Sequence, residues 1–385
     1  MDFNSIVNKF EKKATPFYYY DTELLLSTLQ KIKEAVGSNH YQIHYAVKAN
    51  SNPSILRIIA EAGLGADCVS GGEIEACLKA GFPANKIVFA GVGKMDWEIN
   101  LGIENDIETF NVESKPELEI INELARAKGK IARIAFRINP NVDAHTHANI
   151  TTGLNENKFG ISMDDMEEAI LCAKAMDHVE YVGLHFHIGS QILHFECFEE
   201  LCKRINELQT KLETKGITTP SLNVGGGLGI DYDHPNRYPI PDFKEYINVF
   251  RKNLELRPNQ MLHFELGRSV VAQCGSMITK VIYVKQAALK QFVIVDGGFT
   301  DLIRPALYQA FHKIENVCST DVKEKYDVVG PICESSDVFD KDILLNRTKR
   351  GDYLAIRSAG AYGEVMASTY NCRHLINGYT TEELG

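Results

Sequence analysis

The chain repeats a short apolar segment followed by an amphipathic segment eight times over about 225 residues. We expect strands at 43–49, 66–69, 86–90, 109–112, 132–139, 181–189, 222–225 and 262–266. Helical periodicity occupies most of the stretches between them, for example 54–62, 73–80, 115–127, 163–175 and 198–214. This alternation is typical of a parallel (β/α)8 barrel of the TIM type. An open doubly wound sheet is the alternative, and the even spacing favours the barrel.

The pattern changes after about residue 270. Strand-like segments at 276–283, 292–295, 327–329 and 353–356 are not separated by regular long helices, which indicates a second, mainly β domain at the C-terminal end. The segment 16–20, with three consecutive tyrosines, also has a strand-like composition. We therefore expect an α/β chain with a barrel at 22–269 and a β-rich domain at 270–385, which residues 1–21 join.

Composition restricts the classes of partner. The formal net charge of -10 disfavours general binding to nucleic acid or to an anionic membrane. Nine cysteines without a CxxC pair are typical of reduced thiols in the cytosol. The N-terminus lacks the apolar core of a signal peptide, and no apolar run approaches the ~18 residues of a membrane helix. We expect a cytoplasmic protein.

Polar residues gather where the expected barrel strands end. Functional groups of (β/α)8 enzymes lie at the carboxyl ends of the strands, so this position indicates a site. The residues that share it are Lys48, Asp67, Ser70, His187, the run Gly225, Gly226 and Gly227, Glu265 and Arg268.

Lys48 and the glycine run suggest two parts of such a site. A lysine in an apolar strand is costly unless it is paired or neutral, and a lowered pKa makes its amine a nucleophile for aldehydes. Alternatively, Lys48 extends from a strand end to water. Glycines 225–227 let backbone amides approach an anion such as phosphate, with Ser190 as a further donor, although a tight barrel turn also requires glycine.

His185 and His187 are two residues apart, which places both on one face if the strand continues. Such a pair could ligate a metal, with Asp67 and Glu265 as further ligands, or one imidazole could pack and the other line the pocket. A metal site would leave Lys48 without a role, so we expect no metal.

Glu265 has two interpretations. It could form an ion pair with the nearby Arg268. It could instead lie against a pyridine nitrogen, where a carboxylate keeps the nitrogen protonated and makes the ring a strong electron sink.

Nine motifs in this order resemble the pyridoxal-phosphate decarboxylases of the alanine-racemase-like barrel class, and within it the group that acts on diaminopimelate. The resemblance runs from about residue 16 to residue 370. The motifs are YAVKAN at 45–50, GADCVSGGE at 65–73, NKFGI at 157–161, HFHIGSQ at 185–191, NVGGG at 223–227, ELGR at 265–268, RPALY at 304–308, GPICESSD at 330–337 and GAYG at 360–363. Leu266 stands where the family usually has proline, which would stiffen that turn.

The resemblance implies a role for each matching position. Lys48 resembles the Schiff-base lysine, His187 the imidazole stacked on the cofactor ring, and Glu265 the partner of the pyridine nitrogen. The cofactor-binding set implied by the family also contains Asp67, Ser190, Gly225, Gly226, Gly227, Gly267, Arg268 and Tyr362. Cys333 is similar to a cysteine that the partner subunit supplies to return a proton to the substrate carbon. The substrate-binding set implied in this way is Arg268, Arg304, Tyr308, Glu334 and Tyr362.

The family thus implies pyridoxal 5'-phosphate as cofactor, a small amino acid as substrate and a homodimer with shared active sites. The expected reaction converts meso-2,6-diaminopimelate to L-lysine and CO2. A decarboxylase of ornithine, arginine or carboxynorspermidine is the alternative, but those substrates have no distal carboxylate for Arg268 and Arg304. An alanine racemase should pair the ring nitrogen with arginine, which Glu265 argues against. A non-catalytic homologue should have lost Lys48 or Cys333.

Overall fold

The protein is described from a computed structural model that covers residues 3–37, 40–142 and 158–385. By compactness the chain divides into two units. The barrel unit consists of residues 29–229 and 242–267, and the β-rich unit consists of residues 1–28, 230–241 and 268–385. Residues 230–241 therefore belong to the β-rich unit, although the sequence placed them within the barrel.

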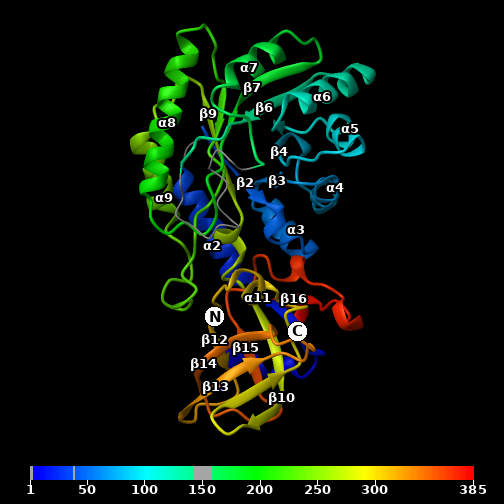
Figure 1. The fold of residues 1–385 in the computed structure, drawn as a ribbon, viewed down its shortest axis with the longest axis vertical. Helices are drawn as coiled ribbons and strands as arrows, with labels where there is room; N and C mark the ends of the chain where they lie inside the picture. Colours follow the sequence, from blue (N-terminus) through cyan, green and yellow to red (C-terminus); the bar gives the residue numbers. More distant parts are fainter. Residues whose placement is uncertain (1–2, 38–39, 143–157) are drawn as a thin grey trace. The chain divides into compact units, whose positions relative to one another are not determined.

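Eight parallel strands close into a barrel, which confirms the expected fold class (Figure 1). The strands are β2 (Tyr41–Ala46), β3 (Gly65–Cys68), β4 (Ile87–Phe89), β5 (Thr109–Val112), β6 (Ala132–Arg137), β7 (Val179–His185), β8 (Ser221–Asn223) and β9 (Met261–Leu266). Pairing between β2 and β9 joins the first barrel strand to the last. All eight expected strands are present, and most are shorter at the carboxyl end than the apolar runs suggested.

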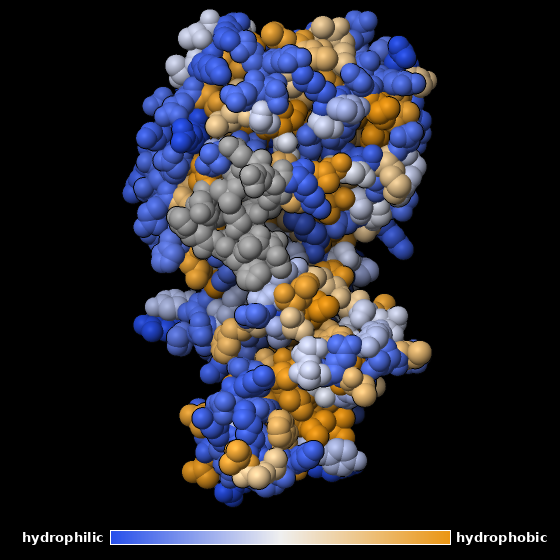
Figure 2. Space-filling model, in the orientation of Figure 1, coloured by the Kyte–Doolittle hydropathy of each residue, from blue (hydrophilic) through white to orange (hydrophobic). Residues whose placement is uncertain are grey.

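A helix follows each of the first seven barrel strands. They are α3 (Pro53–Glu61), α4 (Gly71–Ala80), α5 (Asp96–Glu104), α6 (Lys115–Ala127), α7 (Met166–Lys174), α8 (Glu196–Glu213) and α9 (Phe243–Asn253), while α2 (Thr22–Val36) precedes β2. Helix α8 is amphipathic, and Phe198, Leu201 and Ile205 lie on its buried face. Hydrophilic residues cover most of the face that Figure 2 shows over this helix.

Side-chain caps fix where several of these helices begin. The Asn52 side chain accepts from the Ser54 amide at α3, and Ser114 accepts from the Glu117 amide at α6. Ser70, a candidate at the end of β3, accepts from the Glu73 amide and caps α4. These bonds satisfy amides that a helix leaves unpaired. Capping therefore accounts for Ser70 without a role in chemistry.

The β-rich unit is built on one sheet of eight strands, in which β12, β15, β10, β11, β13 and β14 are successive neighbours. The N-terminal strand β1 pairs with β10 and with β16. The bounds are β1 (Phe17–Tyr20), β10 (Gly275–Gln286), β11 (Gln291–Val295), β12 (Ile314–Asn316), β13 (Lys323–Val329), β14 (Val338–Asn346), β15 (Tyr353–Ile356) and β16 (Gly378–Thr380). Short helices α10 (Arg268–Val271), α11 (Arg304–Tyr308) and α12 (Thr381–Leu384) complete it, with α1 (Val7–Phe10) near the N-terminus.

Aromatic packing ties the N-terminal segment to this unit. Phe10 packs edge-on against Phe17 and Tyr353, with ring centroids 5.6 and 5.7 Å apart. Phe3, Tyr19 and other apolar side chains complete the cluster. Among the residues described, no helix is both long enough and apolar enough to cross a bilayer.

The glycine run at 225–227 is packed against neighbouring backbone. A Cβ on Gly226 would lie 1.9 Å from the Glu265 carbonyl oxygen, and one on Gly225 would lie 2.4 Å from the Phe186 carbonyl oxygen. Gly225 also has a positive φ of 68°. Any side chain here would separate the end of β8 from its two neighbours, so the barrel requires these glycines whatever they bind.

Gly226→Ala should therefore lower the free energy of unfolding by about 1–3 kcal/mol, the usual effect of overpacking. Gly93→Ala is the matched control, because a Cβ there meets nothing within 4 Å and the backbone is not left-handed. Urea unfolding of both variants measures the difference. Equal stability of the two variants would show that the glycine run tolerates a side chain.

Candidate active site

Lys48 lies in a single 3-10 turn, Val47–Ala49, directly after β2. The expected strand 43–49 thus ends early, and Lys48 follows the strand rather than belonging to it. Its ammonium Nζ lies 2.5 Å from Oδ2 of Asp67 on β3, and this aspartate side chain is 1% exposed. Pairing between β2 and β3 brings the two residues together.

Asp67 is a buried carboxylate with one oxygen still available. Burial raises its pKa, Glu265 raises it further, and Lys48 opposes both effects. Oδ1 is buried and has no hydrogen-bond partner among the residues described. An unpaired buried oxygen beside an amine is unusual, and it provides an acceptor for a group that enters the barrel.

Glu265, near the end of β9, accepts hydrogen bonds on both carboxylate oxygens. Oε1 accepts from the Asn223 amide at 2.7 Å and from the Asn111 amide at 3.3 Å. Oε2 lies 2.9 Å from Nε2 of His185. Burial alone would raise the pKa of Glu265, but His185 and Lys48 lower it below its ordinary value. The geometry therefore holds a permanent negative charge inside the barrel, as the pyridine-partner interpretation requires.

His185 and His187 have different roles in the structure. Strand β7 ends at His185, and its Nδ1 has no hydrogen-bond partner in the described part of the chain. His187 lies beyond the strand, and its Nδ1 accepts from the Gly226 amide at 3.3 Å. Burial lowers the pKa of His187 to about 3. His187 is therefore a neutral imidazole at physiological pH.

The loops after β7 and β8 lie side by side. The Ile192 amide donates to the Gly227 carbonyl, and the Gly229 amide donates to the Ile192 carbonyl. Ser190 precedes this contact by two residues, so the structure brings Ser190 and the glycine run to adjacent loops. Gly267 packs against Ala46 and Ala49, where a Cβ would lie 3.1 Å and 3.2 Å from the two alanine Cβ atoms. Their role in binding phosphate remains a prediction.

The β-rich unit gathers a second group of predicted residues around Tyr232, which the sequence analysis missed. Arg268 donates to the Tyr232 hydroxyl oxygen at 2.7 Å, and Arg304 donates to the same oxygen at 2.9 Å. Burial alone would raise the pKa of Tyr232, but the two guanidinium groups lower it below its ordinary value. One phenol oxygen thus holds two arginines together.

His312 orients Arg304 from the other side. Its Nδ1 lies 2.9 Å from the Arg357 carbonyl oxygen, which can only accept, so Nδ1 carries the proton. Nε2 is then the acceptor for Arg304 at 3.0 Å. Burial and then Arg304 lower the pKa of His312 to about 3, which preserves this neutral tautomer. Arg304 and Arg268 are both buried.

Tyr362 and Tyr308 belong to the same unit. The Arg268 guanidinium lies over the Tyr362 ring, 4.9 Å from its centroid. Tyr308 ends α11, the helix that begins with Arg304. Tyr362 thus packs against the same guanidinium that donates to Tyr232.

Cys333 and Glu334 lie on an exposed loop of the β-rich unit. Glu334 accepts from the Tyr370 hydroxyl at 2.8 Å and from Ser336 at 3.2 Å. The Cys333 amide donates to Asn371 at 3.4 Å. The hydrogen bonds of Glu334 thus lead to its own surface loop and to Tyr370, not to Arg268 or Arg304.

Sequence reasoning missed Asn111, Asn223 and Tyr232, and left the partner of His185 open. The two asparagines carried a usable signal, because a buried amide within a barrel strand needs a hydrogen-bond partner. Tyr232 carried none, since it follows a barrel strand in sequence but belongs to the β-rich unit. Within the motif at 157–161, Asn157 lies outside the residues that the structure describes.

Comparison with known proteins gives consistent results. The family model of the pyridoxal-dependent decarboxylases, pyridoxal binding domain, matches residues 23–272. Diaminopimelate decarboxylase of Bacteroides thetaiotaomicron is 65% identical over 379 residues, which are 98% of this chain and 98% of that protein. The crystal structure of diaminopimelate decarboxylase from Helicobacter pylori complexed with L-lysine matches with a TM-score of 0.92 at 42% identity. The match covers 97% of this chain and 93% of that one.

The similarity of fold extends further. A lysine/ornithine decarboxylase from Vibrio vulnificus, complexed with putrescine, has a TM-score of 0.85 at 20% identity, and the match covers 98% of each chain. At this identity the comparison shows a shared fold alone.

Proposed function

Because this chain belongs to the diaminopimelate decarboxylase family of pyridoxal-dependent decarboxylases, we propose that it converts meso-2,6-diaminopimelate to L-lysine and CO2. It is a carboxy-lyase, and its cofactor is pyridoxal 5'-phosphate. The observation that carries the proposal is the buried, ionised Glu265 with three hydrogen-bond donors, in the same barrel as the Lys48–Asp67 pair. We also propose that the enzyme is cytoplasmic.

The barrel residues fit the cofactor. Lys48 offers an amine, Asp67 offers a buried unpaired oxygen, and Glu265 offers a fixed negative charge for a ring nitrogen. When bound, pyridoxal phosphate supplies a protonated ring that accepts the electron pair released as the carboxyl group departs. The negative charge on Glu265 would keep that nitrogen protonated, and the neutral His187 would add no positive charge beside it.

Further residues would hold the cofactor in place. Lys48 would bind it through its amine, and Asp67 would keep that amine in position. Gly227, Ser190, Gly267 and Tyr362 form the proposed phosphate-binding set, and Gly225, Gly226 and Arg268 complete the proposed cofactor-binding set. Lys48 or Cys333 then returns a proton to the substrate carbon that has lost CO2.

Substrate choice follows from the arginines. Diaminopimelate has a distal carboxylate and a distal ammonium, and both must be paired when they are buried. Arg268 and Arg304 offer forked donors to the carboxylate, and Tyr232 aligns both guanidinium groups. Tyr308 and Tyr362 add donors, and Glu334 balances the ammonium. Ornithine, arginine and carboxynorspermidine lack this carboxylate, so the buried arginines argue against those alternatives.

The cofactor assignment predicts the effect of Lys48→Ala. This variant should fold and lose kcat by on the order of 10⁴-fold or more, because it lacks the amine that binds the cofactor and transfers protons. Borohydride treatment of the wild type should bleach the cofactor absorbance and label residue 48. Lys31→Ala, a surface variant, is the control. Near wild-type turnover of Lys48→Ala, free of contaminating enzyme, would remove Lys48 from the mechanism.

The substrate assignment predicts strong selectivity. A site built around a polar group can reject analogues lacking it by ~10⁴-fold, so ornithine, arginine and lysine should be very poor substrates. Arg304→Gln should cost about 2–5 kcal/mol of transition-state binding. Tyr232→Phe should lower kcat/KM roughly tenfold, since it removes one acceptor shared by two charged donors. Measurement of kcat/KM for meso-2,6-diaminopimelate, ornithine, arginine and lysine tests the substrate assignment. Comparable rates on ornithine would exclude a diaminopimelate-specific site while leaving the cofactor chemistry intact.

We further propose a homodimer in which the partner subunit supplies Cys333 and Glu334 to each site. Their exposed position supports this, because residues of the reacting centre should not remain open to solvent. The symmetry of a two-fold dimer would complete two such sites at once.

Shared sites predict complementation between inactive subunits. Lys48→Ala and Cys333→Ala should each be nearly inactive alone. Mixed dimers contain one site in which both residues are intact, so random subunit exchange should restore up to roughly a quarter of wild-type activity. Activity and subunit exchange are measured together on the same mixture. Proven exchange without recovery would place both residues of each site in one subunit.

A further inference from the structure

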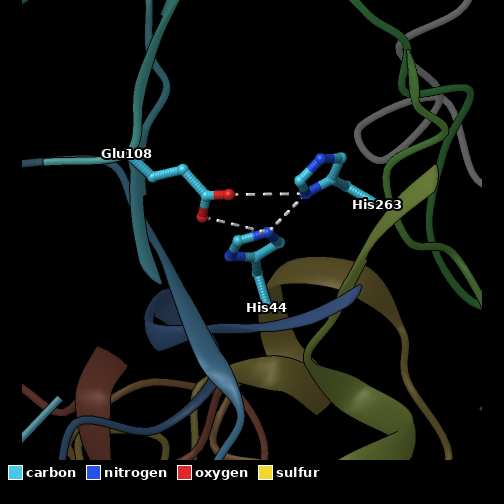
Figure 3. Close-up of side chains that lie close together, drawn as sticks. All are labelled: His44, Glu108 and His263. Carbon is cyan, nitrogen blue, oxygen red and sulfur yellow. Dashed lines mark hydrogen bonds and ion pairs between the residues drawn. The ribbon is translucent and has the colours of Figure 1, made fainter. Parts of the chain in front are cut away.

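Two histidines and a glutamate that the predicted site does not include meet inside the barrel unit (Figure 3). His44 lies on β2, His263 on β9, and Glu108 directly before β5. His263 lies two residues nearer the start of β9 than Glu265, and Glu108 stands at the amino end of its strand. His44 pairs with Glu265 in the β2–β9 register, so the cluster lies next to the Glu265 layer, on the side away from the carboxyl ends where catalytic groups of this fold lie.

The three side chains converge on one point. Nε2 of His44 lies 2.9 Å from Nδ1 of His263. The Glu108 carboxylate oxygens lie 3.7 Å from Nε2 of His44 and 4.0 Å from Nδ1 of His263. In a tetrahedral zinc site, bonds of about 2.0–2.1 Å place the ligand atoms roughly 3.3 Å apart. The observed distances bracket this value, so small side-chain shifts would admit an ion.

The outer contacts of His44 prepare its ring for coordination. Nδ1 lies 3.2 Å from the Lys86 carbonyl oxygen, which can only accept a hydrogen bond. Nδ1 therefore carries the proton, and Nε2 presents a lone pair to the cluster. Metal-binding histidines usually have such a carbonyl partner on the other ring nitrogen. Without an ion, Nδ1–H of His263 donates to this lone pair.

The outer contacts of Glu108 serve the same purpose. The Gln42 amide donates to Oε2 at 3.1 Å, and this bond orients the carboxylate. Arg133 lies nearby, but its guanidinium donates to the backbone carbonyls of Ile107 and Glu108. The Lys86 ammonium donates to the Gly63 carbonyl. The positive charges of Arg133 and Lys86 would repel a metal ion. Their hydrogen bonds go to backbone carbonyls, however, and leave the Glu108 carboxylate oxygens to other groups.

We propose that His44, His263 and Glu108 form a site for a divalent transition metal of the zinc type, with solvent as the fourth ligand. Two imidazoles and one carboxylate are a common set for zinc. On binding, neutral His263 moves its proton from Nδ1 to Nε2, so no net proton is released. The Glu108 side chain is 20% exposed and that of His263 is 10% exposed, which provides a path from solvent.

The ion would have a structural role. His44 and His263 lie on β2 and β9, the pair that joins the first and last barrel strands. Glu108 adds the start of β5, which is not a neighbour of either strand in the barrel order. One ion would thus link three strands across the interior. The expectation of no metal from sequence concerned the strand ends near His187. His44 and His263 lie 219 positions apart in the sequence.

The test uses tag-free holoenzyme, treated with a chelator and then titrated with Co²⁺ or Zn²⁺. Wild type should bind one Co²⁺ per chain with tetrahedral d–d bands and without the charge-transfer band of thiolate ligation. Glu108→Gln should bind at least tenfold more weakly, although it keeps the hydrogen-bonding shape and all nine cysteines. Glu104→Gln is the matched control, because that carboxylate is 57% exposed at the end of α5 and should leave binding unchanged.

Thermal unfolding provides a second measurement. Zn²⁺ should raise the unfolding temperature of wild type and of Glu104→Gln by several degrees, because an ion that binds only the folded state stabilises it. It should not raise that of Glu108→Gln. If Glu108→Gln does not fold, His263→Gln takes its place. Equal Co²⁺ binding by wild type and the cluster variant, or no binding by wild type, would reduce the cluster to a buried hydrogen bond between two imidazoles.

Discussion

The parallel pairing of β2 with β9 is the constraint on which the barrel site depends. Its register places His44 opposite Glu265 and Tyr45 opposite Leu266, so the turn that carries Lys48 begins directly beyond the last paired residues. A slip of one residue would exchange the inward and outward faces of one strand. Glu265 and the lysine turn would then no longer share the interior. The same strand pairing therefore closes the barrel and places the chemical groups.

Burial has opposite consequences for two carboxylates in that interior. Asp67 and Glu265 are both buried, and burial alone raises the pKa of either one. The carboxylate oxygens of Glu265 accept hydrogen bonds from Asn111, Asn223 and His185, and its pKa falls. Asp67 has Lys48 on one oxygen, no donor from the described residues on the other, and the Glu265 charge nearby, so its pKa rises. The hydrogen-bond donors and charges around each carboxylate, and not how deeply it is buried, decide which one stays ionised.

The sequence predicted the architecture because hydrophobic periodicity survives without tertiary context. All eight barrel strands were located in this way, and the even spacing favoured closure. The extent of the strands was predicted less well, because an apolar run does not reveal where pairing stops. Lys48 illustrates this: Val47 and Ala49 are as buried as strand residues, but they belong to a turn. Tyr232 was not predicted, because its neighbours Arg268 and Arg304 come from segments 36 and 72 residues away.

Strand β9 carries two buried titratable groups, His263 and Glu265, in successive layers of the barrel. His263 and Glu265 point to the same side of the strand, since side chains alternate with a period of two. Glu265 must remain charged for the proposed chemistry, and it accepts hydrogen bonds from Asn111, Asn223 and His185. One layer below, burial lowers the pKa of His263 to about 3, so no competing positive charge arises there at physiological pH. A neutral imidazole at this position is compatible with the donors that hold Glu265. The layer that contains His263 is therefore available for another task, such as holding the first and last strands together.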